Sequence, residues 1–321
     1  MIKYFSTFSG IGAFEYAIKK LGLERKCVGF SEIDKHAIKT YNKHYQNHKN
    51  YGDITKINTD ILPNFGILVG GSPCQSFSIT GSKKGFDDYR GNLFFDYIRI
   101  LKEKQPDYFI FENVRGILTN NKGKTFKIIT NEFDIAGYNI KRKVLNSENF
   151  GVAQNRPRVF IIGQKKSLGK FDFDFPIGIN NKGILKNILE EKVDKKYYVS
   201  DTQIRNWYKS NFHSHKSQFL NKTCCCLTVG GNQKRIITNK ADEFIKRYYN
   251  KQLNENELNG IIGRKLTIGE YLRLQGFPDG YTNSDLSNTQ KYKQISNSIN
   301  IDVLKEILKN LDIYIKKSKK I

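Results

Sequence analysis

The chain has 321 residues, of which 54 are basic and 31 acidic, so its formal charge at pH 7 is +23. Mean hydropathy is −0.56. No run approaches the ~20 apolar residues of a membrane span, and the first residues lack a signal-peptide pattern. Recurring aromatic and aliphatic residues argue against disorder. We therefore expect a soluble globular protein of one large or two smaller domains. Its charge favours a polyanion such as nucleic acid, unless it merely reflects a lysine-rich composition.

Five cysteines occur without the regular spacing of a disulfide framework. Three of them are consecutive, which suits neither a structural zinc site nor an ordinary disulfide. We expect a cytoplasmic protein with reduced thiols and no bound metal, in which at least one thiol is reactive. The five are Cys27, Cys74, Cys224, Cys225 and Cys226.

Short apolar runs alternate with helical patterns in the first half of the chain. This alternation is typical of βαβ units, so it predicts an α/β fold with a doubly wound, mostly parallel sheet. Ligands of such sheets bind beyond the carboxyl ends of the strands. The predicted strands cover residues 3–8, 26–31, 65–69, 108–111 and 159–163, and the predicted helices cover 14–21, 35–45 and 92–104.

The alternation stops near Gly178. The following segment is polar, with short irregular strand-like pieces, and predicts a smaller β-rich domain. Helical periodicity returns near Leu266, and a last amphipathic helix is expected over residues 301–311. We therefore divide the chain into residues 1–177, 178–262 and 263–321, the last of which returns to the first domain.

Three predicted loops carry residues suited to an adenosine-containing ligand. The first contains Gly10 and Gly12, which allow close approach of a ligand to the backbone. Glu32 follows the second strand, where α/β nucleoside binders place an acid that accepts from ribose hydroxyls. Asp53, in the next loop, is suited to accept from an adenine amino group. A tight turn would explain the glycines alone, and a surface position would explain either acid alone. The occurrence of all three features in this order favours an adenosine-containing ligand.

A cysteine follows the central apolar run 65–69, in the segment Gly70-Gly71-Ser72-Pro73-Cys74. An inert buried cysteine would be expected inside such a run, whereas one just beyond its end is placed to react. Glu112 ends the next predicted strand. Because the carboxyl ends of neighbouring parallel strands meet at one sheet edge, we expect Cys74 and Glu112 to face one pocket.

These residues belong to an ordered set of motifs that resembles the DNA cytosine-5 methyltransferases of bacterial restriction-modification systems. The resemblance covers about residues 3–164 and 264–311. It implies a Rossmann-like S-adenosylmethionine-dependent methyltransferase domain, with a target-recognition domain at 178–262. The motifs are Pro73-Cys74-Gln75 with Phe77-Ser78, Glu112-Asn113-Val114, Gln154-Asn155-Arg156-Pro157-Arg158, Leu274-Gln275-Gly276-Phe277-Pro278 and Tyr292-Lys293-Gln294-Ile295-Ser296-Asn297-Ser298.

The resemblance implies a catalytic role for four residues. Cytosine C5 is a poor nucleophile, and addition of a thiolate at C6 activates it. Cys74 would be that thiolate, and Glu112 would donate or share a proton at N3. Arg158 would position the base, with Arg156 as its neighbour. After methyl transfer a base removes the C5 proton and Cys74 leaves. The sequence does not identify that base, and water is one candidate.

The implied methyl donor is S-adenosylmethionine. Glu32 would bind its ribose, Ile33 would pack on adenine, and Asp53 would meet the adenine amino group. The remaining predicted cofactor residues are Phe8, Gly10, Gly12, Ile54, Leu93, Asn297 and Ser298.

The implied macromolecular partner is double-stranded DNA. Its target base must be flipped out, because ring chemistry is impossible inside the stack. Gln75 and Ser78 are expected to fill or brace the gap, and Thr228, Gly230 and Gly231 to contact DNA. Base-edge contacts are expected from residues 178–262, with Arg205, His213, Gln218, Gln233, Lys234 and Arg235 as candidates.

Three positions depart from the family pattern. Ser6 stands where an acid is usual and Ala13 where a second glycine is usual, but small residues should preserve cofactor binding. Cys226 stands where a threonine is common, which puts a hydroxyl contact there in doubt. It also favours a strand, rather than a metal or redox site, as the setting of Cys224–Cys226.

The sequence thus predicts a sequence-specific DNA cytosine-5 methyltransferase, acting as a monomer without a membrane partner. It would act either as an orphan or beside a restriction endonuclease that shares its site without a stable complex. A tRNA cytosine-5 methyltransferase and a non-catalytic nucleic-acid binding module remain alternatives; a dinucleotide oxidoreductase would leave Pro73-Cys74-Gln75 unexplained. Residues 178–262 carry seven more basic than acidic side chains, where an even spread gives about six. We therefore expect the charge to be a diffuse field for phosphate.

Overall fold

The structure is a computed structural model of the whole chain. It forms two compact units, which are described separately. Unit 1 comprises Met1–Asn146, Pro157–Gly178 and Ile301–Ile321, and unit 2 comprises Ser147–Arg156 and Ile179–Asn300. The predicted division at residues 177 and 262 stays a prediction. The described residues are 1–73, 93–179, 183–200, 202, 205–206, 209, 218–220, 224–227, 235–238, 247, 252–254, 256–257 and 263–318.

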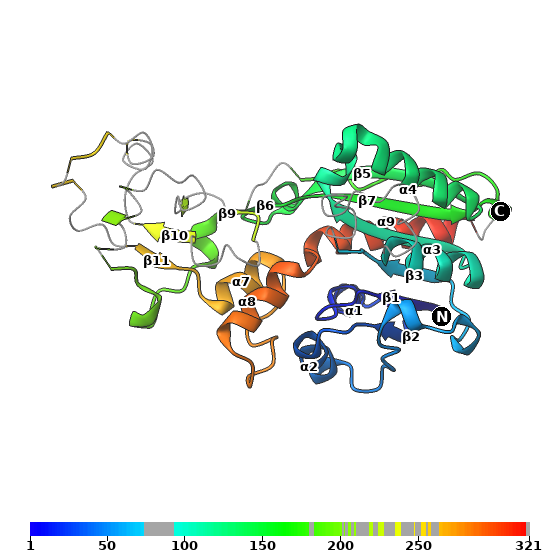
Figure 1. Cartoon of the computed structure of the whole chain (residues 1–321), viewed down its shortest axis with the longest axis horizontal. Coiled ribbons are helices and arrows are strands. Elements are labelled where there is room, and N and C mark those ends of the chain that lie inside the picture. Colours follow the sequence, from blue (N-terminus) through cyan, green and yellow to red (C-terminus); the bar gives the residue numbers. More distant parts are fainter. Residues whose placement is uncertain are drawn as a thin grey trace, which may run out of the picture. The chain divides into compact units, whose positions relative to one another are not determined.

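Unit 1 is built on a six-stranded sheet with the strand order β2-β1-β3-β4-β7-β5 (Figure 1). The strands β2, β1, β3 and β4 are parallel, whereas β7 is antiparallel to both of its neighbours. The predicted mostly parallel α/β sheet is confirmed. The strands are β1 (Ile2–Thr7), β2 (Arg25–Ser31), β3 (Ile67–Gly70), β4 (Tyr108–Val114), β5 (Tyr138–Asn146) and β7 (Pro157–Lys165).

The antiparallel pair of β5 and β7 differs from the expected βαβ rhythm. The strand predicted over 159–163 is present within β7, but β5 was not predicted. It is an edge strand in the sheet order, and three consecutive residues in it, Arg142 to Val144, are exposed. Its pattern therefore lacks the apolar alternation by which strands are recognised in a sequence.

Helices and an aromatic core complete unit 1. The side chains of α3, β4 and α4 share one buried hydrophobic cluster, in which the Phe109 and Phe133 rings stack at 4.4 Å. The carboxyl-terminal helix α9 packs against α1, and an ion pair joins Arg25 to Asp312. The helices are α1 (Ala13–Leu21), α2 (Lys35–His44), α3 (Leu93–Lys104), α4 (Lys124–Ile135) and α9 (Ile301–Ser318).

The described part of unit 2 contains two small sheets and two α-helices. In the three-stranded sheet, β10 (Arg235–Thr238) lies between β8 (Gln218–Leu220) and β11 (Gly263–Lys265). The pair β6 (Gln154–Asn155) and β9 (Cys224–Cys225) is parallel, so the strand expected at the cysteine cluster is present. The helices are α7 (Ile268–Gln275) and α8 (Asn288–Asn297).

A buried ion pair lies within unit 2. Arg264 donates from Nη2 to Glu270 Oε1 at 2.6 Å, and the Glu270 side chain is fully buried. Glu270 also accepts from the backbone of Thr267, and these two residues form a capping box at the start of α7. Because each charge has a close partner, burial of the pair leaves neither charge uncompensated.

Short 3₁₀ helices connect these elements. Within the described residues, these 3₁₀ helices are Ile54–Lys56, Thr59–Ile61, Arg115–Leu118, Asn120–Gly123, Ser147–Phe150, Lys166–Leu168, Leu185–Ile188 and Lys195–Tyr197. Among the described residues, no helix has both the length and the apolar character needed to cross a bilayer.

Glu15 of α1 gives unit 1 a pH-dependent stability. Its side chain is buried, and this burial raises its pKa from 4.5 to about 7. Its ionisable neighbours Tyr4, Cys27 and Tyr41 stay neutral between pH 5 and 8, because burial raises their pKa values as well. The folded state therefore favours protonated Glu15, and its stabilising contribution, complete below pH 4.5, is lost as the pH rises through 7.

We predict that Glu15→Gln, which cannot ionise, raises the melting temperature at pH 8 more than at pH 5. The shift in pKa corresponds to a free energy on the order of 3 kcal/mol at high pH. Thermal unfolding of both proteins across this pH range checks the prediction, with the exposed Glu24→Gln as control. Parallel melting profiles for Glu15→Gln and the wild type would contradict it.

Candidate active site

The first loop at the carboxyl edge of the sheet has a left-handed backbone. Phe8, Gly10 and Gly12 have φ angles of 51°, 54° and 84°. A Cβ added to Gly12 would lie 2.7 Å from the Tyr45 ring, so this position requires glycine for space as well as for conformation. The predicted glycine loop is therefore present directly after β1.

Glu32 joins this loop to the end of β2. Its Oε2 accepts from the backbone N–H of Gly10 at 2.8 Å, and its Oε1 accepts from those of Ile33 and Asp34, each at 2.8 Å. Ile33 is 71% exposed. A fixed carboxylate beside an exposed aliphatic side chain matches what the ribose and adenine of a nucleoside require.

Asp53, Ile54 and Leu93 have different surroundings. Asp53 Oδ1 accepts from the Thr55 backbone and hydroxyl at 3.0 and 2.8 Å, and these hydrogen bonds lower its pKa, so it stays an acceptor at neutral pH. Ile54 is buried, so only its backbone could serve a ligand. Leu93 begins α3 and packs against the hydrophobic cluster.

Glu112 and Arg158 form an ion pair at the same edge. Arg158 Nε lies 3.1 Å from Glu112 Oε1, and both side chains are about six-sevenths buried, at 15% and 13% exposure. Glu112 lies opposite Phe160 and Arg158 lies opposite Val114 in the β4–β7 register. The two charged residues are thus diagonal neighbours on one face of the sheet.

The strand end that leads to Cys74 is fixed against Glu112. A Cβ on Gly71 would come within 2.4 Å of the Glu112 carbonyl oxygen and 3.0 Å of its Oε2. Asn113 Nδ2 donates to Ser72 O at 3.0 Å. The described residues run to Pro73 and resume at Leu93, so the predicted residues Cys74, Gln75 and Ser78 lie outside them.

Gly71 and Asn113 were not singled out as site residues. In the sequence, the features that could have indicated them are the glycine pair after β3 and the asparagine directly after Glu112. Neither signal specifies a contact, because the neighbour that each residue meets is about 40 positions away in the sequence. Ser72 adds a buried hydroxyl with no hydrogen-bond partner among the described residues.

Arg156, Asn297 and Ser298 belong to unit 2. The buried Arg156 guanidinium donates to Leu227 O at 3.1 Å, to Ser296 O at 2.7 Å and to Ser298 O at 2.9 Å. This environment favours an architectural role within unit 2, and the predicted catalytic role of Arg156 stays a prediction. So does cofactor binding by Asn297 and Ser298.

The predicted DNA contacts fall largely outside the described residues. This holds for Thr228, Gly230 and Gly231, and also for His213, Gln233 and Lys234. Gln218 and Arg235 begin β8 and β10. Their roles and that of Arg205 stay predictions.

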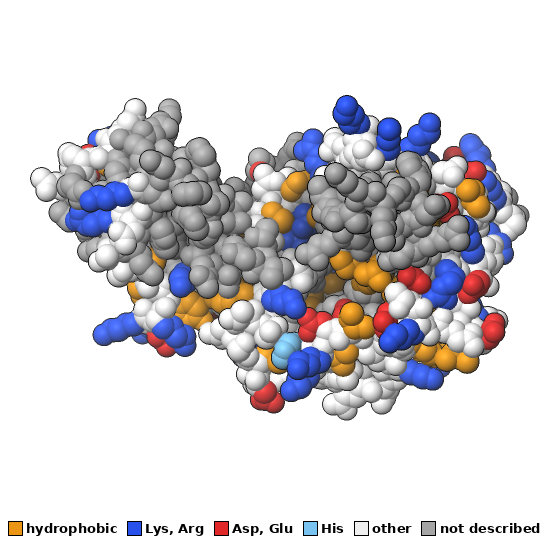
Figure 2. All heavy atoms as spheres, viewed as in Figure 1, with side chains coloured by type: hydrophobic (Ala, Val, Ile, Leu, Met, Phe, Trp, Pro, Cys, Tyr) orange, Lys and Arg blue, Asp and Glu red, His pale blue; other side chains and the backbone are white. Residues whose placement is uncertain are grey.

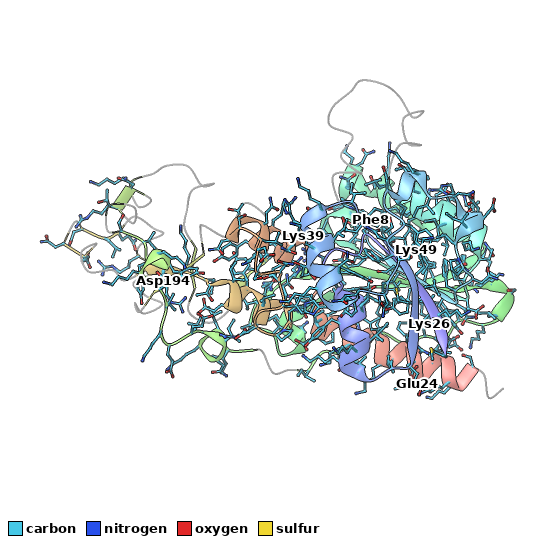
Figure 3. All side chains as sticks on the ribbon, turned by 90° about the horizontal axis from the view of Figure 1, so that it is seen from below. Phe8, Glu24, Lys26, Lys39, Lys49 and Asp194 are labelled. Atoms are coloured by element: carbon cyan, nitrogen blue, oxygen red, sulfur yellow. The ribbon has the colours of Figure 1, made fainter. Side chains whose placement is uncertain are left out.

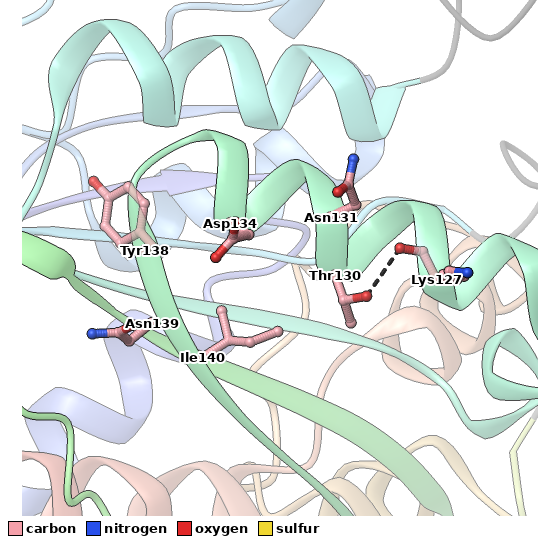
Figure 4. Close-up of a pocket in the computed structure, with 7 residues that line it drawn as sticks. All are labelled: Lys127, Thr130, Asn131, Asp134, Tyr138, Asn139 and Ile140. Carbon is pink, nitrogen blue, oxygen red and sulfur yellow. Dashed lines mark hydrogen bonds between the residues drawn. The ribbon is translucent and has the colours of Figure 1, made fainter.

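A surface hollow between α4 and β5 is separate from these residues. Figure 4 shows its lining, in which Thr130 donates its hydroxyl to Lys127 O at 2.9 Å. No predicted site residue lines it; the lining comprises Lys127, Thr130, Asn131, Asp134, Tyr138, Asn139 and Ile140.

Comparison with known proteins identifies the family of this chain. The family model for C-5 cytosine-specific DNA methylases matches residues 2–312. The orphan methyltransferase M.Rho11sI of Bacillus phage rho11s is 45% identical over 230 residues, which are 62% of this chain and 46% of that protein. The type II methyltransferase M1.ScrFI of Lactococcus lactis subsp. cremoris is 37% identical over 99% of this chain and 80% of its own length.

A solved structure shows the same fold. A DNMT2 variant from Spodoptera frugiperda superposes with a TM-score of 0.78 at 23% identity, covering 97% of this chain and all of that one. The sequence match across nearly the whole chain, together with this fold, confirms the resemblance predicted from the motifs. The chain belongs to the C-5 cytosine-specific DNA methylase family and is a DNA cytosine-5 methyltransferase.

Proposed function

We propose that this enzyme methylates a flipped cytosine within a specific DNA sequence, with Cys74 as the nucleophile. The observation that carries the proposal is the Glu112–Arg158 pair at 3.1 Å, beside the strand end that enters Pro73 and Cys74. This arrangement provides an acid and a fixed cation next to a predicted nucleophile, which are the groups that activation of cytosine requires.

Glu112 would act at ring N3. Addition of the Cys74 thiolate to C6 forms a carbon–sulfur bond and leaves negative charge on the ring, which a proton from Glu112 at N3 would neutralise. Arg158 pairs with Glu112 Oε1. It would therefore keep the carboxyl group of Glu112 oriented and stabilise the negative charge that this group acquires when it gives up its proton. After C5 has taken the methyl group, a base would accept the C5 proton, the Cys74 thiolate would leave from C6, and the N3 proton would return to Glu112, which restores the neutral aromatic ring.

Unit 1 also offers the features expected for the cofactor. S-adenosylmethionine, the methyl donor used by this family, would supply the methyl group to C5. Glu32 would accept from its ribose hydroxyls, Ile33 would cover its adenine, and Asp53 would accept from the adenine amino group. The left-handed loop of Gly10 and Gly12 would admit the ligand close to the backbone.

We further propose that residues 178–262 form the target-recognition domain and that Thr228, Gly230 and Gly231 contact DNA. The relative M1.ScrFI is a type II methyltransferase by name. Protection of host DNA from a restriction endonuclease is the role that we assign on this basis, with the enzyme acting as a monomer.

Methyl transfer from tritiated S-adenosylmethionine tests the substrate class. We predict label in duplex DNA and none above background in tRNA, because the family model and the named relatives are DNA methylases. Bisulfite sequencing of DNA from an expressing host would then identify the modified sequence. Label in tRNA alone would overturn the proposal in favour of a tRNA methyltransferase.

A mechanism-based trap tests Cys74. With duplex DNA that carries 5-fluorocytosine, elimination is blocked because fluorine cannot leave as a cation, so we predict a covalent complex that survives denaturing electrophoresis. Cys74→Ser should abolish it, whereas Cys27→Ser, which alters a described cysteine of β2, should retain it. Absence of the complex with the wild-type enzyme would instead favour a non-catalytic binding module.

Removal of the acid at residue 112 tests its proton role. We predict that Glu112→Gln lowers kcat by about 10²- to 10⁴-fold, which is the usual contribution of a positioned general acid. Binding of S-adenosylmethionine should be unchanged, because its proposed partners lie after β1 and β2. Single-turnover methylation and equilibrium cofactor binding measure the two effects, with Glu24→Gln as control. A methylation rate near that of wild type would exclude the role.

A further inference from the structure

A group of exposed cations lies beside the candidate active site in unit 1. Residues 115–131 contain four basic and no acidic side chains. We define the basic surface as these four, Arg115, Lys122, Lys124 and Lys127, together with Arg142 of β5. All five are exposed, and Figure 2 shows Lys and Arg side chains gathered over α4.

The neighbouring elements hold these cations together. Arg142 places its guanidinium 4.4 Å from the Phe126 ring centroid, so β5 contributes this cation to the α4 side of the sheet. Lys124 and Lys127 are three residues apart and share one face of α4. Arg142 also lines a second hollow, which contains Asp174 and the other two β5 cations, Lys141 and Lys143.

The basic surface has no internal counter-charge. Within the described part of the chain, none of its five members forms an ion pair. The acids of α4 are at its other end, where Glu132 pairs with Lys102 at 3.0 Å and Asp134 pairs with Lys166 at 2.8 Å. A bound polyanion would relieve the mutual repulsion of these five cations. The basic surface is therefore suited to bind a polyanion.

Its position connects it to the site. Arg115 directly follows β4, three residues beyond Glu112. The turn that follows places Asn121 and Lys122 in the left-handed region, with φ angles of 49° and 54°. Backbone strain of this kind is concentrated at functional sites.

We infer that the basic surface binds phosphates of double-stranded DNA that flank the target base. The inference rests on the proposed DNA methyltransferase function and adds a sequence-independent contact surface in unit 1, outside residues 178–262. Such contacts fix the enzyme on the duplex without reading its bases.

The test is the salt dependence of binding to a duplex of random sequence, which requires no knowledge of the recognition site. For each phosphate that the protein no longer neutralises, the slope of log K against log salt falls in magnitude by about 0.9. The triple variant Lys122→Gln, Lys124→Gln, Lys127→Gln should therefore reduce the slope by about 2 to 3 and bind on the order of 10- to 100-fold more weakly at low salt. Replacement of the same three residues by arginine should restore both values.

A matched control removes the same charge elsewhere. Lys3, Lys26 and Lys317 are exposed and form no ion pair within the described residues. Figure 3 labels Lys26, at the amino end of β2, and Phe8, just beyond the carboxyl end of β1. The triple Lys→Gln variant at these control positions should keep the wild-type slope. An equal reduction in the control variant, or a wild-type slope in the α4 variant, would overturn the inference.

Methylation separates this inference from the proposed function. The α4 variant should show a higher KM for DNA with unchanged kcat and unchanged binding of S-adenosylmethionine. If the wild-type enzyme labels no DNA, the proposed function fails. If wild type and variant label DNA with the same KM, the basic surface alone is refuted.

Discussion

Gly71 lies so close to the end of β4 that it has no room for a side chain, and the candidate site depends on this close approach. The chain leaving β3 passes so near the end of β4 that a Cβ would meet the Glu112 carbonyl oxygen at 2.4 Å. Parallel pairing, with Gly70 opposite Phe111, brings the two strand ends to one edge. Asn113 then fixes the next residue by donating to Ser72 O. The segment that leads to Pro73 is therefore tied to the end of β4 by the close approach of Gly71 and by the side chain of Asn113.

The direction of β7 explains how an arginine joins that acid. A further parallel strand would begin at the opposite edge of the sheet, far from the end of β4. Because β7 runs antiparallel, its second residue, Arg158, lies opposite Val114 and reaches Glu112 diagonally. The departure from an all-parallel sheet is thus what completes the charged pair.

The positive charge of the chain is less uniform than its distribution along the sequence indicates. Residues 178–262 carry little more than their even share, yet part of the excess gathers on the basic surface between β4 and β5. The difference arises from pairing: the carboxylates of α4 neutralise lysines from α3 and from the turn after β7. Lys124 and Lys127, on the other half of α4, form no ion pair within the described residues.

The sequence by itself determined the strands of unit 1 other than β5 and its α-helices other than α4. It also determined the positions of Gly10, Glu32, Cys74 and Glu112 after or at strand ends. Apolar periodicity and the order of motifs are local signals, so a single chain displays them. It did not reveal β5, whose exposed charged stretch hides the strand pattern, nor the antiparallel course of β7. Only the tertiary structure placed Arg156 on the carbonyl groups of Leu227 and Ser298, because those partners are 71 and 142 positions away and no local pattern encodes such a contact.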